Sequence, residues 1–471
     1  MRWSRGVLLL AVASVVSLAM ERSVAAESIR VQDVPHIQQK PDFCGEACVA
    51  MALQGLGVQV DQDAVFDHSG LDPVEGRGCY TRELVRAVKS LGFDPGPVWY
   101  AVDPKQADAD LERAVNWLVN SLSRGQMSIV CMHYDGEPKS PEHFRLLLAY
   151  DAGTDEFLYH EPAVADGRAL RMSRARLKEL WPLKYEADRW SLVSLSMKPV
   201  QLPAAEASER FTAADYAQHI HALKKTLPPG FHLQIEEPFV VAGDEAPKTV
   251  DQRSQETVRW AVDRLRRDYF QRDPLEIVTV WLFRDNVSYE THVEKLFGKK
   301  PTTPYGYYSP AHRALVMNIS TGGGTLVHEL VHPFIQSNFW RCPAWFNEGL
   351  ASLYEQSADR EGHIVGLTNW RLKGLQRTIG EGKLPSFDTL CHTTTNEFYG
   401  DRQGTNYAQA RYLCYYLQEQ GKLVQFYHQF VKNGATDPSG YATLKSILGT
   451  EDMAQFQKDW EAYVRKLSFP D

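Results

Sequence analysis

Two histidines and a glutamate stand together in the segment His328-Glu329-Leu330-Val331-His332. On a helix, a spacing of four residues stacks the two imidazoles one turn apart on a single face, where both can bind one metal ion. Glu329 lies on the neighbouring flank of the turn, so its carboxylate can take a proton from an activated water. We interpret His328 and His332 as ligands of one Zn²⁺ ion and Glu329 as the general base.

A hydrolytic zinc site also needs a third protein ligand and one open position for water. Glu348 is the candidate, because the fifteen residues between it and His332 can hold a turn and the start of a second, antiparallel helix. Pro333 removes one helical hydrogen bond, so we expect the first helix to kink or weaken directly after His332. The competing interpretation is an exposed helix with two solvated histidines.

The motif His328-Glu329-x-x-His332 with a downstream Glu348 resembles the gluzincins, a class of zinc peptidases. The resemblance implies a zincin fold in which His328, His332 and Glu348 bind the metal. It also implies that the strand Arg313–Ile319 corresponds to the edge strand on which gluzincins lay an extended peptide.

The segment Asn406–Leu413 looks like a helix of peptidase-MA-like proteins that supplies a tyrosine or histidine to the site. This likeness implies that Tyr407 meets the charge that develops on the substrate oxygen, as transition-state stabilisation requires. A tyrosine at a helix start can instead be a packing residue whose hydroxyl is satisfied elsewhere.

A second candidate site lies in the first half of the chain, where Cys44 is expected to begin a helix. The positive end of a helix dipole favours the thiolate, so this cysteine can be a nucleophile. It then needs an imidazole to accept its proton, a group that orients the ring, and an oxyanion donor. The sequence offers His143 as the base, Glu161 as the orienting group and Gln38 as the oxyanion donor.

Residues 30–197 resemble the papain-like bacteriocin-processing peptidases, which remove double-glycine leader peptides. Gln38 keeps the family spacing before Cys44-Gly45, and Glu161 occupies the position where the family has aspartate. The family usually forms part of a transporter with an ATP-binding domain. This sequence has no Gly-x-x-x-x-Gly-Lys-Ser/Thr loop, so a transporter role is not expected. The alternative is a domain that binds peptides without cleaving them.

The elements expected to position the cysteine site are helices first and an antiparallel sheet second. The predicted helices are Cys44–Leu56, Arg82–Leu91 and Asp110–Leu122, and the predicted strands are Ser128–Met132, Phe144–Tyr150 and Glu156–His160.

The second half alternates strands and helices before helices dominate to the end of the chain, so the fold class is α+β with a helical C-terminal lobe. The predicted strands are 233–241, 276–283, 305–309 and 313–319, and the predicted helices include 250–270, 289–297, 407–420 and 453–466.

Composition indicates a globular protein, and the N-terminal segment indicates an exported one. The 51 Lys and Arg residues against 59 Asp and Glu form no basic stripe, so nucleic acid is not an expected partner. Residues 1–26 have the pattern of a signal peptide, with Arg2 and Arg5 before the apolar run Val7–Met20. A retained anchor is the alternative, but the run is shorter than the roughly 20 residues that a membrane span requires. We expect a secreted or periplasmic protein whose mature chain has no membrane span.

Seven cysteines in an exported chain imply that some pair, and the odd number leaves at least one thiol free. We expect the pairs Cys48–Cys79 and Cys342–Cys391, which keep each bridge inside one domain. A free Cys44 would explain the odd count. A disulfide from Cys44 to either nearby cysteine would instead exclude it as a nucleophile.

The proline-rich stretch 198–206 marks a domain boundary. The sequence therefore predicts a papain-like domain at 27–200, a linker at 201–207 and a gluzincin-type zinc peptidase domain at 208–471 that hydrolyses a peptide or protein substrate. One rival is a protein that binds peptides or cell-wall components, with an inactive papain-like domain and structural zinc. The other is a zinc hydrolase of a non-peptide substrate.

Overall fold

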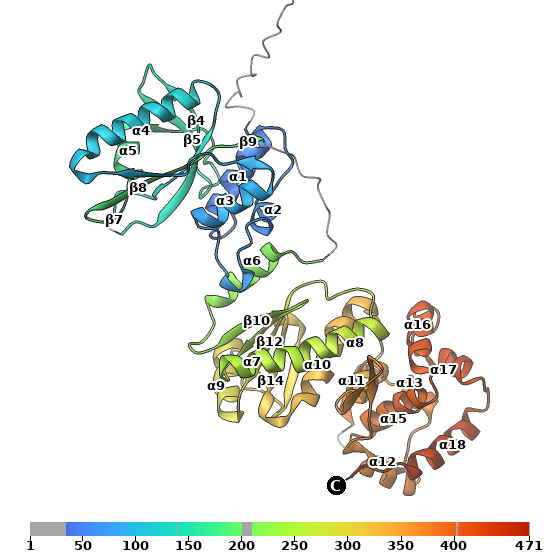
Figure 1. Ribbon diagram of the computed structural model, residues 1–471. Helices are drawn as coiled ribbons and strands as arrows, with labels where there is room; N and C mark the ends of the chain where they lie inside the picture. Colours follow the sequence, from blue (N-terminus) through green and yellow to red (C-terminus); the bar gives the residue numbers. More distant parts are fainter. Residues whose placement is uncertain (1–33, 138, 200–209, 402–403, 471) are drawn as a thin grey trace, which may run out of the picture. The chain divides into compact units, whose positions relative to one another are not determined.

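The computed structural model describes residues 34–137, 139–199, 210–401 and 404–470 (Figure 1). The predicted signal peptide 1–26 and linker 201–207 lie outside the described residues. The described chain divides into two compact units. The domain limits 27–200 and 208–471 stay a prediction from the sequence. The first unit comprises described residues up to Gln38, Met51–Gln59 and Gly96–Met197, and the second comprises Gln39–Ala50, Val60–Pro95 and the chain from Lys198 onward.

The first unit is built on an antiparallel sheet, as the sequence predicts. Within the described residues the order is β2-β8-β3-β4-β5-β6, and β7 pairs with β8. Helices α4 (Ala107–Leu122) and α5 (Arg174–Leu180) lie against it and share its apolar core (Figure 1). The strands are β2 (Trp99–Val102), β3 (Ser128–His133), β4 (Glu142–Asp151), β5 (Glu156–His160), β6 (Leu170–Ser173), β7 (Leu183–Glu186) and β8 (Arg189–Leu195).

Short helices precede this sheet in the sequence. Helix α1 (Cys44–Gly55) begins at the candidate nucleophile and carries small, fully buried residues along most of its length. Helices α2 (Gln62–Asp67) and α3 (Thr81–Ser90) also precede the sheet, β1 (Phe93–Asp94) pairs with β9 (Lys198–Pro199), and α6 (Ala213–Lys224) follows the sheet in the sequence.

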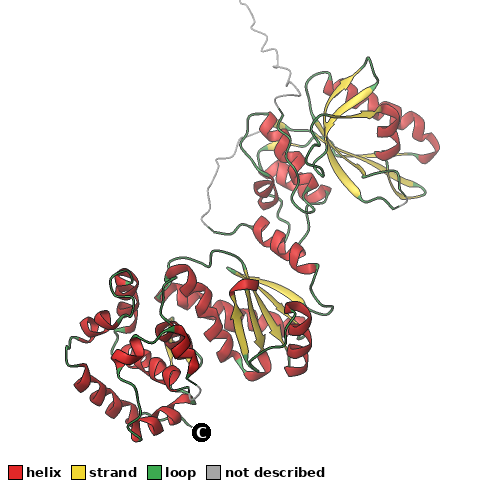
Figure 2. Cartoon of the chain, turned by 180° about the vertical axis from the view of Figure 1, so that it is seen from behind, coloured by secondary structure: helices red, strands yellow, loops and turns green. Residues whose placement is uncertain are grey.

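The second unit contains a mixed sheet with the order β10-β11-β12-β14-β13 within the described residues. The pairs β11–β12 and β12–β14 are parallel, and the two outer pairs are antiparallel. Figure 2 shows these strands between helices. The strands are β10 (His232–Glu236), β11 (Phe239–Gly243), β12 (Val278–Phe283), β13 (Gly306–Ser309) and β14 (Ala314–Asn318).

Two strand predictions for this sheet are wrong. The single strand predicted at 233–241 is a hairpin, because Pro238 cannot donate a ladder hydrogen bond and lies at the turn between β10 and β11. The strand predicted at Arg313–Ile319 is not the sheet edge. It is β14, which lies between β12 and β13, so β13 is the edge strand.

Both faces of this sheet are covered, because successive strand residues point to opposite sides. One face shares a core with α8 (Trp260–Asp268) and α10 (Gly323–Asn338). The other face packs against α6 and α9 (Asn286–Phe297). The remaining elements before α8 are α7 (Pro247–Arg253) and a π-helical turn, Ser254–Arg259.

Helices dominate the chain after the sheet, as predicted, apart from the short hairpin β15 (Ser357–Arg360) and β16 (His363–Gly366). Helix α10 continues five residues beyond Pro333, so the proline does not end it. The helices are α11 (Ala344–Leu353), α12 (Arg371–Gly380), α13 (Phe387–Cys391), α14 (Thr395–Gly400), α15 (Thr405–Glu419), α16 (Leu423–Asn433), α17 (Tyr441–Leu448) and α18 (Met453–Lys466).

The predicted disulfides are not formed, and Cys79, Cys342 and Cys391 are free thiols. The backbone N–H of Cys79 donates a hydrogen bond to Glu46 Oε1 at 2.7 Å. The Cys342 thiol lies 3.7 Å from the carbonyl oxygen of Pro343. Among the described residues, every helix is too short or too polar to span a membrane.

Candidate functional site

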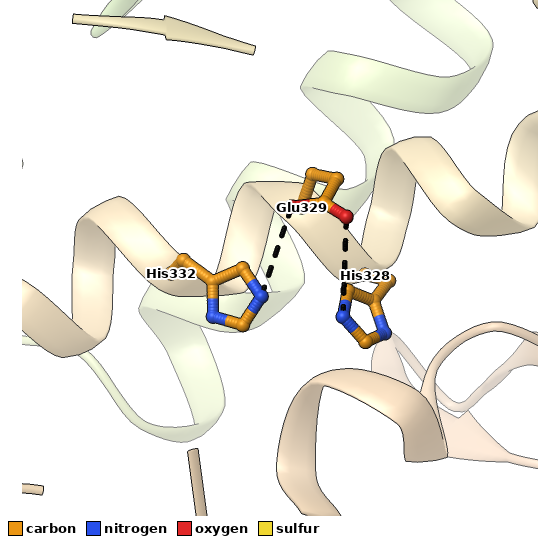
Figure 3. A group of neighbouring side chains, drawn as sticks. All are labelled: His328, Glu329 and His332. Atoms are coloured by element: carbon orange, nitrogen blue, oxygen red, sulfur yellow. Dashed lines mark ion pairs between the residues drawn. The ribbon is translucent and has the colours of Figure 1, made fainter. Parts of the chain in front are cut away.

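Helix α10 carries His328, Glu329 and His332 close together, with the glutamate between the two imidazoles (Figure 3). The ring centroids lie 5.0 Å apart, as stacking on successive turns requires. Ligand atoms of the three side chains all lie within 4.8 Å of one another. His328 and Glu329 are each only 8% exposed, so the group faces a largely desolvated space.

Helix α11 brings Glu348 to the same place. Its Oε2 lies 3.3 Å from His328 Nε2 and its Oε1 lies 4.0 Å from His332 Nε2. Two ligands bound to one tetrahedral zinc at about 2.1 Å lie about 3.4 Å apart, so these separations fit a single ion. Gly349 permits the helix packing, because a Cβ there would lie only 3.1 Å from the carbonyl oxygen of Ala410 on α15.

Two outer side chains lie beside the imidazoles. His332 Nδ1 lies 3.0 Å from Oδ1 of Asn347, and the Nδ1 of His328 lies 3.5 Å from Oε1 of Glu355. Each ring therefore presents Nε2 to the shared space, which is the atom that a metal ion would bind. Arg371 in turn donates to both carboxylate oxygens of Glu355, at 2.7 and 3.0 Å.

The buried charges of this group depend on one another. Burial raises the pKa of Glu348, but its contacts with the two histidines outweigh that and bring the pKa to about 2. The pKa of Glu355 is also about 2, because His328 and Arg371 outweigh the effect of burial. Two imidazoles and an ionised carboxylate form the donor set of many hydrolytic zinc sites, so the residues present fit a zinc ion.

Glu355→Gln is expected to lower zinc affinity by about 10- to 100-fold, because outer groups that orient a metal-binding histidine contribute on that scale. The amide keeps the shape of the side chain but loses the charge that faces His328. Competition for zinc against a coloured chelator measures the change. Glu294→Gln, an exposed position on α9, is the matched control. Equal zinc affinity in both variants would contradict the role given to Glu355.

A cavity of about 430 Å³ opens over these residues. The edge strand β13 borders it, and the backbone N–H of Tyr308 donates to Glu329 Oε2 at 2.8 Å. The predicted residues His328, Glu329, His332, Glu348 and Tyr407 all line this cavity. Its aromatic lining comprises Tyr307, Tyr308, Phe339, Trp340, Tyr399 and Tyr407.

Two tyrosines, Tyr399 and Tyr407, lie beside Glu348 in this cavity. The Tyr399 hydroxyl donates to Glu348 Oε1 at 2.6 Å, and its ring centroid lies 6.2 Å from that of Tyr407. Burial raises the pKa of both hydroxyls above the usual value for tyrosine, so both remain proton donors. The sequence prediction missed Tyr399, because nothing in its spacing separates it from the other tyrosines of the chain.

In the first unit, His143 and Glu161 are in direct contact. His143 Nε2 lies 2.5 Å from Glu161 Oε1, and both residues are almost fully buried. Burial raises the pKa of Glu161, but hydrogen bonding and charge from His143 and Arg145 outweigh it and lower the pKa. Because an ionised carboxylate only accepts, the ring hydrogen lies on Nε2 and the basic nitrogen is Nδ1. The sequence prediction did not include Arg145.

Cys44 and Gln38 belong to different units. Cys44 is the first residue of α1 and is half-buried in the second unit, whereas Gln38 is exposed in the first. Glu46, in the first turn of the same helix, is fully buried and accepts a hydrogen bond from the backbone N–H of Cys79 at 2.7 Å. This bond fixes the segment before α3 against the start of α1.

Glu46 makes the stability of the protein depend on pH. Burial raises its pKa from 4.5 to about 7. Between these values the unfolded chain is ionised while the folded chain holds the proton, so the free energy of unfolding falls as pH rises. The full loss is about 3 kcal/mol. Urea unfolding at pH 5 and pH 7.5 should show most of this loss for wild type but not for Glu46→Gln. The same pH dependence in both proteins would contradict the assignment.

Comparison with known proteins concerns the first part of the chain. Residues 31–187 match the Peptidase_C39 like family, and this region is a C39-like, papain-like cysteine peptidase domain. A C39-like peptidase from Bacillus anthracis is 18% identical, with 37% of this chain and 100% of that chain covered and a TM-score of 0.26. The peptidase domain of Streptococcus ComA, a bifunctional ABC transporter involved in quorum sensing, is 16% identical, with 35% and 98% covered and a TM-score of 0.25. No curated protein matches the chain.

Proposed function

We propose that this protein is a zinc-dependent peptidase, with His328, His332 and Glu348 as metal ligands and Glu329 as the general base. The observation that carries the proposal is the convergence of both Nε2 atoms on the Glu348 carboxylate, with distances of 3.3 and 4.0 Å. Histidines on a solvated helix would be exposed to water, would not share a carboxylate and would not lie beside the outer side chains Asn347 and Glu355.

The chain's own residues supply the remaining chemistry. When bound, zinc would polarise the scissile carbonyl and lower the pKa of a water. Glu329 accepts the proton of the attacking water and transfers it to the leaving amine. Tyr407 donates to the carbonyl oxygen as negative charge develops on it, and Tyr399 holds the Glu348 carboxylate in place.

A peptide fits this cavity better than a small polar substrate. The edge strand β13 lies beside Glu329, and an extended peptide can add to a sheet edge through its backbone hydrogen bonds. The cavity wall is rich in aromatic side chains, which contact peptide side chains well. Trp340 is 75% exposed at this wall and so is available to a substrate.

A cysteine peptidase activity in residues 31–187 is the second candidate. The family match and the contact between His143 and Glu161 support it. In this proposal Cys44 attacks the scissile carbonyl, His143 accepts the thiol proton through Nδ1, and Gln38 donates to the oxyanion. Hydrolysis of the resulting thioester releases the second product and regenerates the thiol.

Zinc content and hydrolysis measured together test the main proposal. The protein from residue 27 onward, purified with zinc available, should hold one tightly bound ion and cleave casein, and a chelator should stop that cleavage. A preparation without tightly bound zinc would overturn the proposal. Cleavage of small esters without casein would favour the non-peptide hydrolase, and bound zinc without any hydrolysis would favour the binding protein.

The export of the protein belongs to the same proposal. We place the mature chain outside the cytoplasm, because residues 1–26 have the pattern of a signal peptide. Mass spectrometry of the protein recovered from the medium and the periplasm should find an N-terminus near Glu27. Recovery of only the uncleaved chain, from the cytoplasm, would contradict this proposal.

A further inference from the structure

The Glu161 carboxylate is held on both of its oxygens. Oε1 accepts from His143 Nε2 at 2.5 Å and from the backbone N–H of Ala163 at 3.1 Å. Oε2 accepts from Arg145 Nε at 2.6 Å. The side chains of His143, Arg145 and Glu161 are 6 to 7% exposed, so water competes little for these bonds. Glu161 therefore has one oxygen for the imidazole and one for the guanidinium.

Arg145 is itself fixed in place. Its Nη2 donates to the carbonyl oxygen of Tyr134 at 2.8 Å and its Nη1 donates to that of His133 at 3.3 Å. Both acceptors lie at or just beyond the end of β3, which pairs with β4. The rigid fork of donors on a guanidinium therefore ties Glu161 to the backbone of the neighbouring strand.

The sheet places the three side chains together. His143 and Arg145 are two residues apart on β4, so they share one face of the sheet. Leu146 pairs with His160 at the end of β5, so the next antiparallel position sets Glu161 opposite Arg145. The loop after Glu161 is tight, because a Cβ on Gly167 would lie 1.9 Å from the Glu161 carbonyl oxygen.

We propose that Arg145 is a positioning residue that lets a glutamate orient the His143 imidazole. This inference rests on the cysteine peptidase activity proposed above. A glutamate has one more rotatable bond than an aspartate, so its carboxylate can rotate away from the ring unless another group fixes it. Arg145 supplies that group by holding Oε2 while Oε1 faces His143. An aspartate at position 161 would be shorter and would not reach the same two partners.

The ring of His143 gives a test that does not depend on Cys44. Nitrogen NMR of the imidazoles, with His143→Gln to assign the signal among the 15 histidines, reports which ring nitrogen carries the hydrogen. The wild type should hold it on Nε2, and Arg145→Leu should give a mixture of both tautomers. An unchanged tautomer in a folded Arg145→Leu protein would overturn the proposal.

Alkylation of Cys44 by iodoacetamide tests the consequence for the nucleophile. The rate at Cys44, followed by peptide mass spectrometry, should be about tenfold lower at pH 6 in Arg145→Leu, since the imidazolium loses its oriented carboxylate. Loss of the cation alone would also disfavour the thiolate, so the charge-retaining variant Arg145→Lys separates loss of charge from loss of position. Faster or equal alkylation in Arg145→Leu would overturn the proposal.

One further variant separates positioning from stability. Arg145→Lys keeps the charge but loses the fork, so it should share the tautomer mixture and the slow alkylation while unfolding near the wild-type temperature. Full rescue by lysine would overturn the proposal. If wild-type Cys44 reacts like an ordinary thiol at every pH, the cysteine peptidase activity is refuted, and the tautomer measurement still decides the role of Arg145.

Discussion

Glu329→Gln is expected to stop peptide hydrolysis at the metal centre while zinc stays bound. The amide has nearly the same shape and can still accept the Tyr308 N–H through its oxygen, but it cannot take a proton from water. Loss of a general base lowers kcat by about 10²- to 10⁴-fold. The three proposed ligands are untouched, so the variant should hold as much zinc as the wild type.

Parallel measurement of kcat and bound zinc makes this result decisive. Glu294→Gln makes the same chemical change on the exposed face of α9 and should leave both quantities unchanged. Full activity in Glu329→Gln would remove Glu329 from the mechanism. Loss of zinc together with activity would mean that Glu329 contributes to the metal site, as its place within 4.8 Å of both histidines permits.

Local patterns predicted the elements that carry the candidate residues. The spacing of His328 and His332 is a property of one helix, and α10 is that helix. The limits of β5 and α18 coincide with the predicted 156–160 and 453–466, because both segments have a clear period and clear ends. The choice of edge strand was wrong because it depends on the pairing of β14 with β12, which lies far away in the sequence.

The supporting residues of both sites lay beyond sequence reasoning for a related reason. Arg145 meets Glu161 across a strand pair, and Tyr399 meets Glu348 across 51 positions. Glu355 lies just beyond the end of α11, and its role depends on where the chain leaves that helix beside His328. None of these residues has a spacing that marks it, whereas their partners stand in short motifs. The motifs give the reacting groups, and only the fold gives the groups that hold them.

The two candidate centres differ in chemistry, so they can be separated without dividing the chain. The proposed metal centre would depend on a removable ion, and its proposed mechanism uses no nucleophilic thiol. The cysteine centre depends on a thiolate and has no metal ligand. A chelator therefore acts on the metal centre, whereas an alkylating agent can react with Cys44 and also with Cys342 at the wall of the metal-centre cavity, so a Cys342→Ala background keeps the two treatments separate. The activity that remains after each treatment therefore reports on one centre within the intact protein.

Cys44→Ala is expected to lower the chelator-resistant cleavage of a peptide with a double-glycine site by at least about 10³-fold, because alanine cannot form the thioester. The same variant should keep its chelator-sensitive cleavage of casein. Cys414→Ala is a fitting control, since Cys414 is a fully buried free thiol on α15 with a pKa raised by burial. Unchanged double-glycine cleavage in Cys44→Ala would exclude Cys44 as the nucleophile. Loss of both activities would instead place casein cleavage at the cysteine centre and leave the metal centre without a catalytic role.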